Sequence, residues 1–380
     1  MHGAIDLLRL ADRARVEGRL GVDTEFMPEG RYRPLLCLVQ VAVGEEIVVL
    51  DPLAALDPAP LAAVLADPAV EIVLHAGRQD VALLRREWRT EVTNVFDTQV
   101  AAGFAGHSAQ AGYLGLLGDV LGVRLAKTAS FTRWDARPLT DEQMRYARED
   151  VEHLIPLALE LQRRLDERGR LDWAREECLP VAGATDEREP EEAWRRLPRA
   201  TGLDARERAV ARELAAWRER TAAAEDRPLG SVLRDPTVVE LARRRPAGRR
   251  ELDAIRGLGP DVVRRRADDI LAAIERGRAA PPLRLEEGDR PRSEAIDGPT
   301  VALAEALVRA RGQEAGLAYE LIAARADLMP IVVAARRGEP EPDVRTLRGW
   351  RRALVGAELL ELLQGRRRLG VGAGGRVEIA

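Results

Sequence analysis

Two acidic residues, Asp23 and Glu25, stand two positions apart at the end of an apolar run within residues 19–29, RLGVDTEFMPE. In a β-strand, residues i and i+2 project from the same face, so this spacing predicts two adjacent carboxylates. Such carboxylates repel each other unless a cation lies between them. Oxygen ligands on a rigid strand suit Mg²⁺ or Mn²⁺, which are commonly shared with substrate phosphates. The alternative is a solvated strand end, which is the commoner meaning of an isolated Asp-x-Glu pair, so the interpretation depends on residues downstream.

Three further residues supply candidate ligands or a catalytic hydroxyl: Asp80 at the end of HAGRQD, and Tyr146 with Asp150 in Tyr-x-x-x-Asp. Tyr146 and Asp150 are i and i+4 on an expected helix, so they share a face. Asp80 follows an expected strand end, where open sheets build their sites. Four converging carboxylates favour two divalent cations, which activate water and stabilise both oxygens of an in-line phosphoryl displacement. A nearby phenol can orient that water without being a ligand.

Two other residues are weaker candidates for the same site. Asp97 is a rival acid, but an Asp-Thr pair between a strand and a helix is more often an N-cap. His75 is more often a hydrogen-bonded histidine at a strand end, because hard cations prefer oxygen ligands.

A basic stretch before the Tyr146 helix carries candidate nucleic-acid contacts, namely Lys127, Arg133, Trp134 and Arg137. Guanidinium groups suit phosphate oxygens, and an indole offers a stacking face for an unpaired base. The alternative is a set of ordinary surface arginines with one packed tryptophan. Lys127 is the only lysine among 59 basic residues, which suggests that it is not neutral filler.

Further arginine clusters lie in residues 205–280, and the candidate contacts there are Arg243, Arg244, Arg264 and Arg265. Arginine clusters are usually a solvated face, but several in one small module are typical of a polyanion-binding surface. The turn at residues 257–260, Gly-Leu-Gly-Pro, precedes a helix and either presents N–H groups to phosphate or is a tight turn between helices.

The elements expected to position these residues begin with a helix over 4–18 and strands over 19–26, 35–43 and 46–51. The strand connections are too short for crossover helices, so these strands should be antiparallel neighbours. Strands over 71–76 and 92–97 then alternate with helices over 58–66, 78–88, 98–105 and 113–122. Hairpins followed by βαβ units predict a mixed sheet flanked by helices.

Beyond this sheet the chain is expected to be helical. A helix from Thr140 to about 168 has a good N-cap, and Pro156 predicts a kink or break in it. Residues 171–204 are acidic and rich in proline, which indicates a linker that wraps rather than folds alone. Four segments follow: a first domain at 1–170, the linker at 171–204, a helical domain at 205–280 and a looser helical repeat at 295–380.

Composition restricts the kind of protein. A chain of 380 residues with only four Phe and four Tyr should form two or three domains with aliphatic, alanine-rich cores. Cys37 and Cys178 cannot form a disulfide framework or a zinc site unaided. No leader pattern and no membrane-length apolar stretch is present, so we expect a cytoplasmic protein. The net charge of −4 is uneven: residues 1–170 sum to −6 and residues 205–280 to +5.

The three acidic motifs together resemble the DEDD superfamily of 3′–5′ exonucleases. Asp-Thr-Glu-Phe at 23–26, the motif ending at Asp80, and Tyr-x-x-x-Asp at 146–150 are similar to its three motifs in order. The histidine branch places a histidine where Arg145 stands, so the tyrosine branch is favoured. Residues 94–99 and 134–139 resemble the flanking blocks of the ribonuclease D family. Residues 205–280 resemble its helicase and ribonuclease D C-terminal (HRDC) domain, and 298–370 look like its second such domain.

This resemblance implies a ribonuclease H-like α/β fold with a mixed sheet, followed by two all-α accessory domains. It implies that Asp23, Glu25, Asp80 and Asp150 bind two divalent cations, Mg²⁺ or Mn²⁺, and that Tyr146 orients the water. The expected activity is 3′–5′ hydrolysis of RNA with a free 3′ end, such as tRNA precursors, with no membrane and no obligate protein partner evident. A DNA-directed relative and a non-catalytic binding protein are the alternatives. The first lacks support because no P-loop is present, and the second because none of the four acids is missing.

Overall fold

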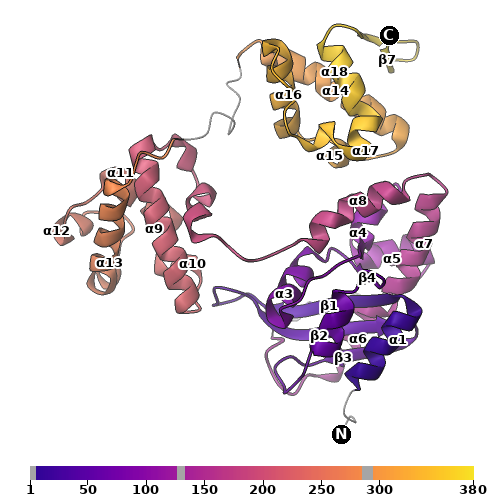
Figure 1. Cartoon of the computed structure of the whole chain (residues 1–380), viewed down its shortest axis with the longest axis horizontal. Coiled ribbons are helices and arrows are strands. Elements are labelled where there is room, and N and C mark those ends of the chain that lie inside the picture. Colours follow the sequence, from indigo (N-terminus) through magenta and orange to yellow (C-terminus); the bar gives the residue numbers. More distant parts are fainter. Residues whose placement is uncertain (1–5, 126–132, 285–293) are drawn as a thin grey trace.

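The computed structural model describes residues 6–125, 133–284 and 294–380. Figure 1 shows three regions: an α/β region that contains the sheet, a first helical region around α9–α13, and a second helical region around α14–α18. The sheet has five strands in the order β3-β2-β1-β4-β5. Their bounds are Arg19–Met27 (β1), Leu35–Val43 (β2), Glu46–Leu50 (β3), Glu71–Leu74 (β4) and Val95–Asp97 (β5).

Strand direction follows from connection length, as the sequence predicts. β1, β2 and β3 are antiparallel neighbours, whereas β4 pairs parallel to β1 and β5 parallel to β4. Opposite Asp23 on β2 lies Gln40, and opposite Glu25 lies Leu38, with an irregularity in the register just after Glu25. The predicted mixed sheet with flanking helices is therefore confirmed.

The two faces of the sheet are covered differently. Leu20 and Val22 share a core with α1, α2 and α3, while Val73 and Phe96 pack in a second core with α4, α5 and α7. These helices are Leu7–Glu17 (α1), Ala59–Leu65 (α2), Arg78–Trp88 (α3), Thr98–Phe104 (α4), Tyr113–Leu121 (α5) and Leu154–Asp166 (α7). Helix α6, Asp141–Glu152, contacts β1, β2 and β3. Because side chains alternate along β1, Asp23 and Glu25 point away from the Leu20 and Val22 core.

The expected long helix from Thr140 is divided into α6 and α7. Thr140 caps α6 in a capping box with Gln143, as its type and position predict. The break falls at His153, three residues before Pro156. Pro156 then lies in the first turn of α7, where its missing N–H has no helical partner to lose. The proline therefore marks the start of the second helix.

Residues 171–204 contain helix α8, Leu171–Ala182, and the 3₁₀ helices η1, Pro190–Arg196, and η2, Ala200–Gly202. Ala174, Cys178 and Val181 of α8 are buried, and α8 packs on α3, α4 and β5. Their spacing of i, i+4 and i+7 is helical, but the charged residues between them make this apolar pattern difficult to recognise in the sequence. Trp194 of η1 is buried against α9. Residues 171–204 were expected to be a linker that wraps rather than folds alone, and in the structure they form short helices packed on α3, α4, β5 and α9.

The first helical region comprises α9 Ala205–Ala224, α10 Leu229–Val232, α11 Asp235–Arg244, α12 Arg249–Leu252 and α13 Pro260–Ala279. Gly257 has φ +87°, and a Cβ there would lie 2.8 Å from the hydroxyl of Thr237. Gly259 is the N-cap of α13 and Pro260 its first residue. This part of the chain is a tight turn between helices, which was the simpler of the two expectations.

The second helical region comprises α14 Asp297–Ala315, α15 Tyr319–Ile322, α16 Arg325–Arg337, η3 Arg345–Leu347, α17 Gly349–Arg351, the π-helical turn η4 Arg352–Gly356 and α18 Ala357–Leu363. A hairpin of β6, Leu369–Val371, and β7, Val377–Ile379, follows. No strand was expected in this glycine-rich tail.

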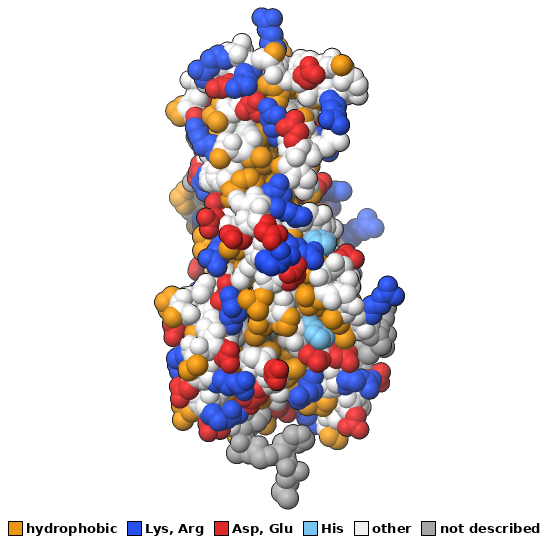
Figure 2. All heavy atoms as spheres, turned by 90° about the vertical axis from the view of Figure 1, so that its right-hand side faces the viewer, with side chains coloured by type: hydrophobic (Ala, Val, Ile, Leu, Met, Phe, Trp, Pro, Cys, Tyr) orange, Lys and Arg blue, Asp and Glu red, His pale blue; other side chains and the backbone are white. Residues whose placement is uncertain are grey.

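Both helical regions contact the α/β region. Trp350 lies between Phe104 and Trp173, with ring centroids 5.1 and 5.2 Å away, and its Nε1 donates to Glu177 at 3.1 Å. The loop between β1 and β2 contacts the first helical region, where the Tyr32 hydroxyl donates to Glu219 at 2.7 Å. Figure 2 shows acidic and basic side chains interspersed on the face that it presents. Among the described residues, no helix is long and apolar enough to cross a membrane.

Candidate active site

Strand β1 and helix α6 bring three of the predicted site residues together. One carboxylate oxygen from each of Asp23, Glu25 and Asp150 lies within 4.8 Å of the other two. Asp23 and Glu25 project from one face of β1 because they are two residues apart, and α6 lies over that face. In the part of the chain that the structure describes, no second group of this kind is found.

Asp80 lies beside this group but is not one of its three members. It is in the first turn of α3, is 7% exposed, and accepts a hydrogen bond from the Thr24 hydroxyl. Its charge nevertheless acts on Asp23 and Glu25, since it contributes to raising the pKa of both. The structure therefore places Asp80 near the cluster, in an orientation set by Thr24.

Burial and mutual repulsion dominate the electrostatics of the four acids. Burial, followed by the charges of Asp80, Asp150 and Glu25, raises the pKa of Asp23 well above its ordinary value. Burial and the Asp150 charge raise the pKa of Glu25 to about 8. Burial also raises the pKa of Asp150 to about 7 and that of Asp80 to about 6. Without a counter-ion, the site therefore retains protons near neutral pH.

These residues fit divalent cations by chemistry as well as by position. They offer hard oxygen ligands on two rigid elements, with no histidine or thiol in the three-residue group. Burial raises the pKa of all three carboxyl groups, and neighbouring carboxylates raise those of Asp23 and Glu25 further. A cation replaces the retained protons and removes the repulsion, so binding and deprotonation are linked.

Tyr146 lies one helical turn before Asp150, and its hydroxyl is hydrogen-bonded to the Asp150 carboxylate. Burial and the charges of Asp150 and Glu25 raise the pKa of Tyr146 above its ordinary value. The phenol therefore stays protonated and donates to the carboxylate, which leaves its oxygen lone pairs to accept a hydrogen bond. The centroid of its ring lies 5.9 Å from that of the Trp134 ring.

The two weaker candidates occupy structural positions. Asp97 is 1% exposed, caps α4, and accepts hydrogen bonds from four backbone N–H groups, those of Ala76, Gly77, Gln99 and Val100. The N-cap interpretation is confirmed. The Nδ1 atom of His75 lies 2.9 Å from the Thr98 hydroxyl, whereas its buried Nε2 has no partner among the described residues. His75 is thus a hydrogen-bonded histidine just beyond the end of β4.

The basic stretch before α6 differs from expectation. Trp134 is 3% exposed and belongs to a small core with Cys37 and Leu38, so it offers no stacking face to an unpaired base. Arg137 donates two 2.7 Å hydrogen bonds to Asp51 and further ones to backbone carbonyls. Trp134 is therefore packed in the fold, as the alternative expectation had it, whereas contact of the exposed Arg137 with nucleic acid stays a prediction.

Arg133 remains on the surface, where it pairs with Asp135 at 2.9 Å. An exposed ion pair of this kind is weak enough to exchange for a phosphate. Lys127 lies outside the described residues.

The four arginines predicted in the first helical region do not form one cluster. Arg243 and Arg244 are at the end of α11, where the Arg278 guanidinium of α13 donates to the carbonyl of Arg245. Arg264 and Arg265 are near the start of α13, about 20 Å from Arg278 at 1.5 Å per helical residue. The structure therefore separates the candidates into two exposed pairs.

Sequence reasoning missed two residues near the carboxylates. Thr24 lies within the first motif, but nothing in the sequence indicates that its hydroxyl donates to Asp80. Tyr113, in the first turn of α5, has its ring 5.4 Å from that of His75, and burial and the charges of Asp150 and Asp23 raise its pKa. No spacing in the sequence connects Tyr113 to the acidic motifs, because only the tertiary fold brings α5 to this edge.

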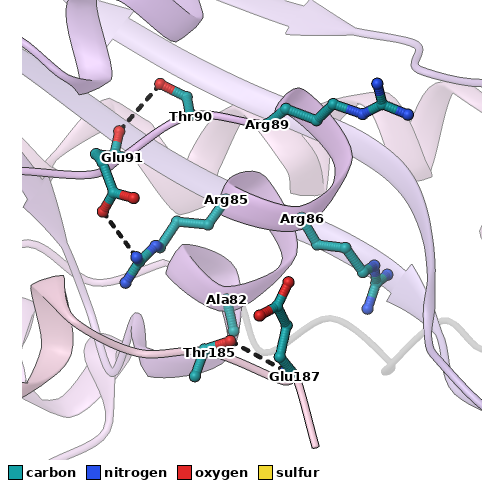
Figure 3. A pocket seen from close by; sticks show the side chains of 8 residues that line it. All are labelled: Ala82, Arg85, Arg86, Arg89, Thr90, Glu91, Thr185 and Glu187. Carbon is teal, nitrogen blue, oxygen red and sulfur yellow. Dashed lines mark hydrogen bonds and ion pairs between the residues drawn. The ribbon is translucent and has the colours of Figure 1, made fainter.

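A separate pocket of about 290 Å³ lies at the C-terminal end of α3 (Figure 3). Arg85 donates to the carbonyls of Ala182 and Ala184 and pairs with Glu91 at 2.7 Å. Arg86 pairs with Asp186 and donates to the carbonyl of Pro34 at 2.6 Å. These contacts tie residues 182–186 to α3, so the pocket is a structural junction rather than part of the acidic site.

Comparisons with known proteins agree with this geometry. A 3′-5′ exonuclease family model matches residues 4–166, and an HRDC domain model matches residues 207–274. Ribonuclease D of Gluconacetobacter diazotrophicus is 39% identical over 376 residues, covering 96% of this chain and 93% of that protein. Ribonuclease D of Acidiphilium cryptum is 38% identical over 377 residues, covering 98% and 94%.

A solved structure extends the similarity to the arrangement of the whole chain. The crystal structure of Escherichia coli RNase D matches with a TM-score of 0.83 and 30% identity, covering 94% of this chain and 96% of that one. This match extends over nearly the full length of both chains. The chain therefore belongs to the ribonuclease D family and is a 3′–5′ exoribonuclease.

Proposed function

We propose that this exoribonuclease hydrolyses RNA from the 3′ end with two divalent cations, held by Asp23, Glu25, Asp80 and Asp150. The observation that carries the proposal is the meeting of Asp23, Glu25 and Asp150, whose half-buried carboxylates repel one another in the absence of positive charge. Bound cations would supply an activated water and charge stabilisation for the phosphoryl displacement. Mg²⁺ and Mn²⁺ both suit this set of oxygen ligands.

We assign to Tyr146 the orientation of the attacking water. Its hydroxyl proton is donated to Asp150, so its oxygen accepts a hydrogen bond from water. Its raised pKa keeps the phenol neutral, which favours positioning over proton removal. The Tyr146 ring packs against the buried Trp134 ring, with centroids 5.9 Å apart, and this packing restrains the phenol.

We further propose that the substrate is structured RNA, with tRNA precursors as the leading candidates. The solved Escherichia coli relative is described as an exoribonuclease involved in structured RNA processing. In this chain, residues 205–280 carry a net charge of +5, and the exposed arginine pairs on α11 and α13 lie at two separate positions. Arg244 pairs with Glu240 and Arg264 with Asp261, and such surface ion pairs are weak enough to exchange for phosphates. Two such positions, toward opposite ends of α13, suit a folded polyanion better than a short strand.

The second helical region is proposed to be a divergent copy of the first. Both begin with a long helix, α9 or α14, followed by a four-residue helix, α10 or α15, and then by α11 or α16. The second copy lacks the Gly-Leu-Gly-Pro turn, and the continuous α13 is replaced by α17, η4 and α18.

The proposal is tested by cleavage assays on a 3′-labelled single-stranded RNA and on the matching DNA. Each substrate is incubated with Mn²⁺, with Mg²⁺ and with chelator. Release of single nucleotides from RNA with either cation, and no release with chelator, is the expected result. The natural substrate is then identified from RNA that copurifies with Asp150→Asn, a variant that should bind RNA and cleave it poorly. Full cleavage in chelator would contradict the cation mechanism.

A further inference from the structure

Thr24 lies between Asp23 and Glu25 in sequence but projects from the opposite face of β1. On that face, Leu20 and Val22 are 0% and 1% exposed and belong to the core under α1, α2 and α3. Thr24 is 5% exposed. A valine would continue this apolar row, whereas a buried hydroxyl needs a hydrogen-bond partner to offset its desolvation.

The partner is the Oδ1 atom of Asp80, which accepts a hydrogen bond from the Thr24 hydroxyl within a buried environment. The backbone N–H of Thr24 also lies against the carboxylates of both Asp23 and Asp80. A hydrogen bond to a carboxylate is stronger than one between neutral groups, and burial removes competing water. Among the described residues, Thr24 is the one side-chain donor found for Asp80, and the other donors to this carboxylate are the backbone N–H groups of Thr24 and of Asp80 itself.

The position of Asp80 makes this contact informative. Asp23, Glu25 and Asp150 form a group of oxygens within 4.8 Å of one another, and Asp80 stands beside it on a different element, α3. A carboxylate at the start of a helix has several rotamers available to it. The Thr24 hydroxyl selects one of them, and it does so from within the motif that also carries Asp23 and Glu25.

We infer that Thr24 is a positioning residue whose hydroxyl orients Asp80 for binding one of the two cations. This inference rests on the proposed role of Asp80 as a ligand. Outer partners of ligating carboxylates fix their orientation, and losing such a partner lowers metal affinity. Thr24 therefore contributes to the affinity of the site for one cation without contacting it, while the cation held by Asp23, Glu25 and Asp150 depends on Thr24 much less.

Calorimetric titration of the full chain with Mn²⁺, without RNA, tests this. Thr24→Val replaces the hydroxyl by a methyl group of similar size. It should raise the dissociation constant of one Mn²⁺ ion by about 10- to 100-fold and leave that of the other unchanged. Thr24→Ser keeps the hydroxyl and should restore binding. Thr24→Cys, which keeps the size and offers only a weak donor, should lie between them and serves if Thr24→Val does not fold.

Thr237→Val is the matched control. Thr237 is 2% exposed, and its hydroxyl donates to the carbonyl of Gly257 at 3.4 Å in the first helical region. The control removes a buried hydroxyl of the same kind away from the acidic site, so it should bind Mn²⁺ as the wild type does. Thermal unfolding of each variant shows that the protein titrated is folded.

Asp80→Asn distinguishes the positioning role of Thr24 from the ligand role of Asp80. If Asp80→Asn weakens one Mn²⁺ site and Thr24→Val binds both ions with wild-type constants, the positioning role of Thr24 is overturned and the ligand assignment stands. If Asp80→Asn itself binds both ions normally, the proposed ligand role of Asp80 fails. Parallel weakening in Asp80→Asn and Thr24→Val, rescued by Thr24→Ser, supports both.

Discussion

At the scale of single residues, Glu25 shows how the acidic site retains protons when no cation is bound. Its pKa is raised from 4.5 to about 8, chiefly by burial and the Asp150 charge. The folded protein therefore keeps a proton that the unfolded chain releases between these values. The stabilisation from this group is fully present below pH 4.5 and is lost as the pH rises toward 8. Asp150 and Asp80, whose pKa values are also raised, act in the same direction.

We predict that the metal-free protein loses stability between about pH 5 and pH 8, and that Glu25→Gln makes this loss smaller by a few kcal/mol. The amide cannot ionise, so it adds no repulsion at high pH. Urea unfolding in chelator at several pH values measures the effect. Glu29→Gln, an exposed residue just beyond the same strand, is the control and should leave the pH dependence unchanged. Equal slopes for wild type and Glu25→Gln would show that Glu25 ionises freely.

Tyr146→Phe should lower the single-turnover cleavage rate by about 100-fold while RNA affinity stays near that of the wild type, since only the hydroxyl that orients water is removed. The ring and its packing on Trp134 are retained. Tyr319→Phe removes a buried phenol hydroxyl in the second helical region and is the matched control. An unchanged single-turnover rate would reduce Tyr146 to a packing residue.

At the scale of elements, the turn between β4 and α3 is held by Asp97 at the start of α4. The carboxylate accepts hydrogen bonds from Ala76 and Gly77 of the turn as well as from the first turn of its own helix. Asp97 thus fixes the direction in which α3 leaves the sheet, and with it the location of Asp80.

Asp97→Ala should lower the free energy of unfolding by about 2–4 kcal/mol, because buried N–H groups lose their acceptor as well as the helix its cap. This is more than a lone helix cap contributes. The Mn²⁺ stoichiometry should stay at the wild-type value below the unfolding temperature, as titration calorimetry measures. Loss of a bound ion from folded Asp97→Ala would instead show that metal binding depends on Asp97, either directly or through the turn that places Asp80.

At the scale of the whole molecule, α8 joins the second helical region to the sheet. Glu177 of α8 accepts from Trp350 and forms an ion pair with Arg351, which is 5% exposed. Trp350 also fills the space between Phe104 and Trp173. A chain ended near Arg199 would expose this aromatic surface, so point substitutions are the sounder way to examine the helical regions.

Trp350→Ala should cost about 3–5 kcal/mol of stability in chemical unfolding, whereas Trp350→Phe, which keeps an aromatic ring, should cost less. The chain ended near Arg199 should be less stable than the full protein for the same reason. Stability of Trp350→Ala equal to that of the wild type would show that the two regions do not stabilise each other.

The exposed arginine pairs should contribute separately to RNA affinity because they lie far apart. Replacing Arg243 and Arg244 by Gln, or Arg264 and Arg265 by Gln, should each make the salt dependence of binding to long RNA shallower. The slope should change by up to about 0.7–0.9 for each phosphate that is no longer neutralised, and combining both pairs should add the changes. Cleavage of a short oligonucleotide should hardly change. Arg9→Gln with Arg13→Gln, on α1, is the charge-matched control. Unchanged slopes for both pairs would make these arginines an ordinary solvated face.

The sequence by itself determined the parts of this protein that depend on local spacing. The Asp23 and Glu25 pair, the one-turn spacing of Tyr146 and Asp150, and the short strand connections fix faces and directions whatever surrounds them. Thr140 and Asp97 act as caps because a cap depends on its own few residues.

Tertiary structure decided everything that depends on contacts between distant segments. Trp134 is buried because a small core forms around it, and Arg137 forms an ion pair because Asp51 lies beside it. The buried side of α8 and the separation of the arginine pairs appear only once neighbouring helices are placed. The bond from Thr24 to Asp80 spans 56 residues. Burial, and the partner that satisfies a buried polar group, are properties of the packed chain, so no local pattern specifies them.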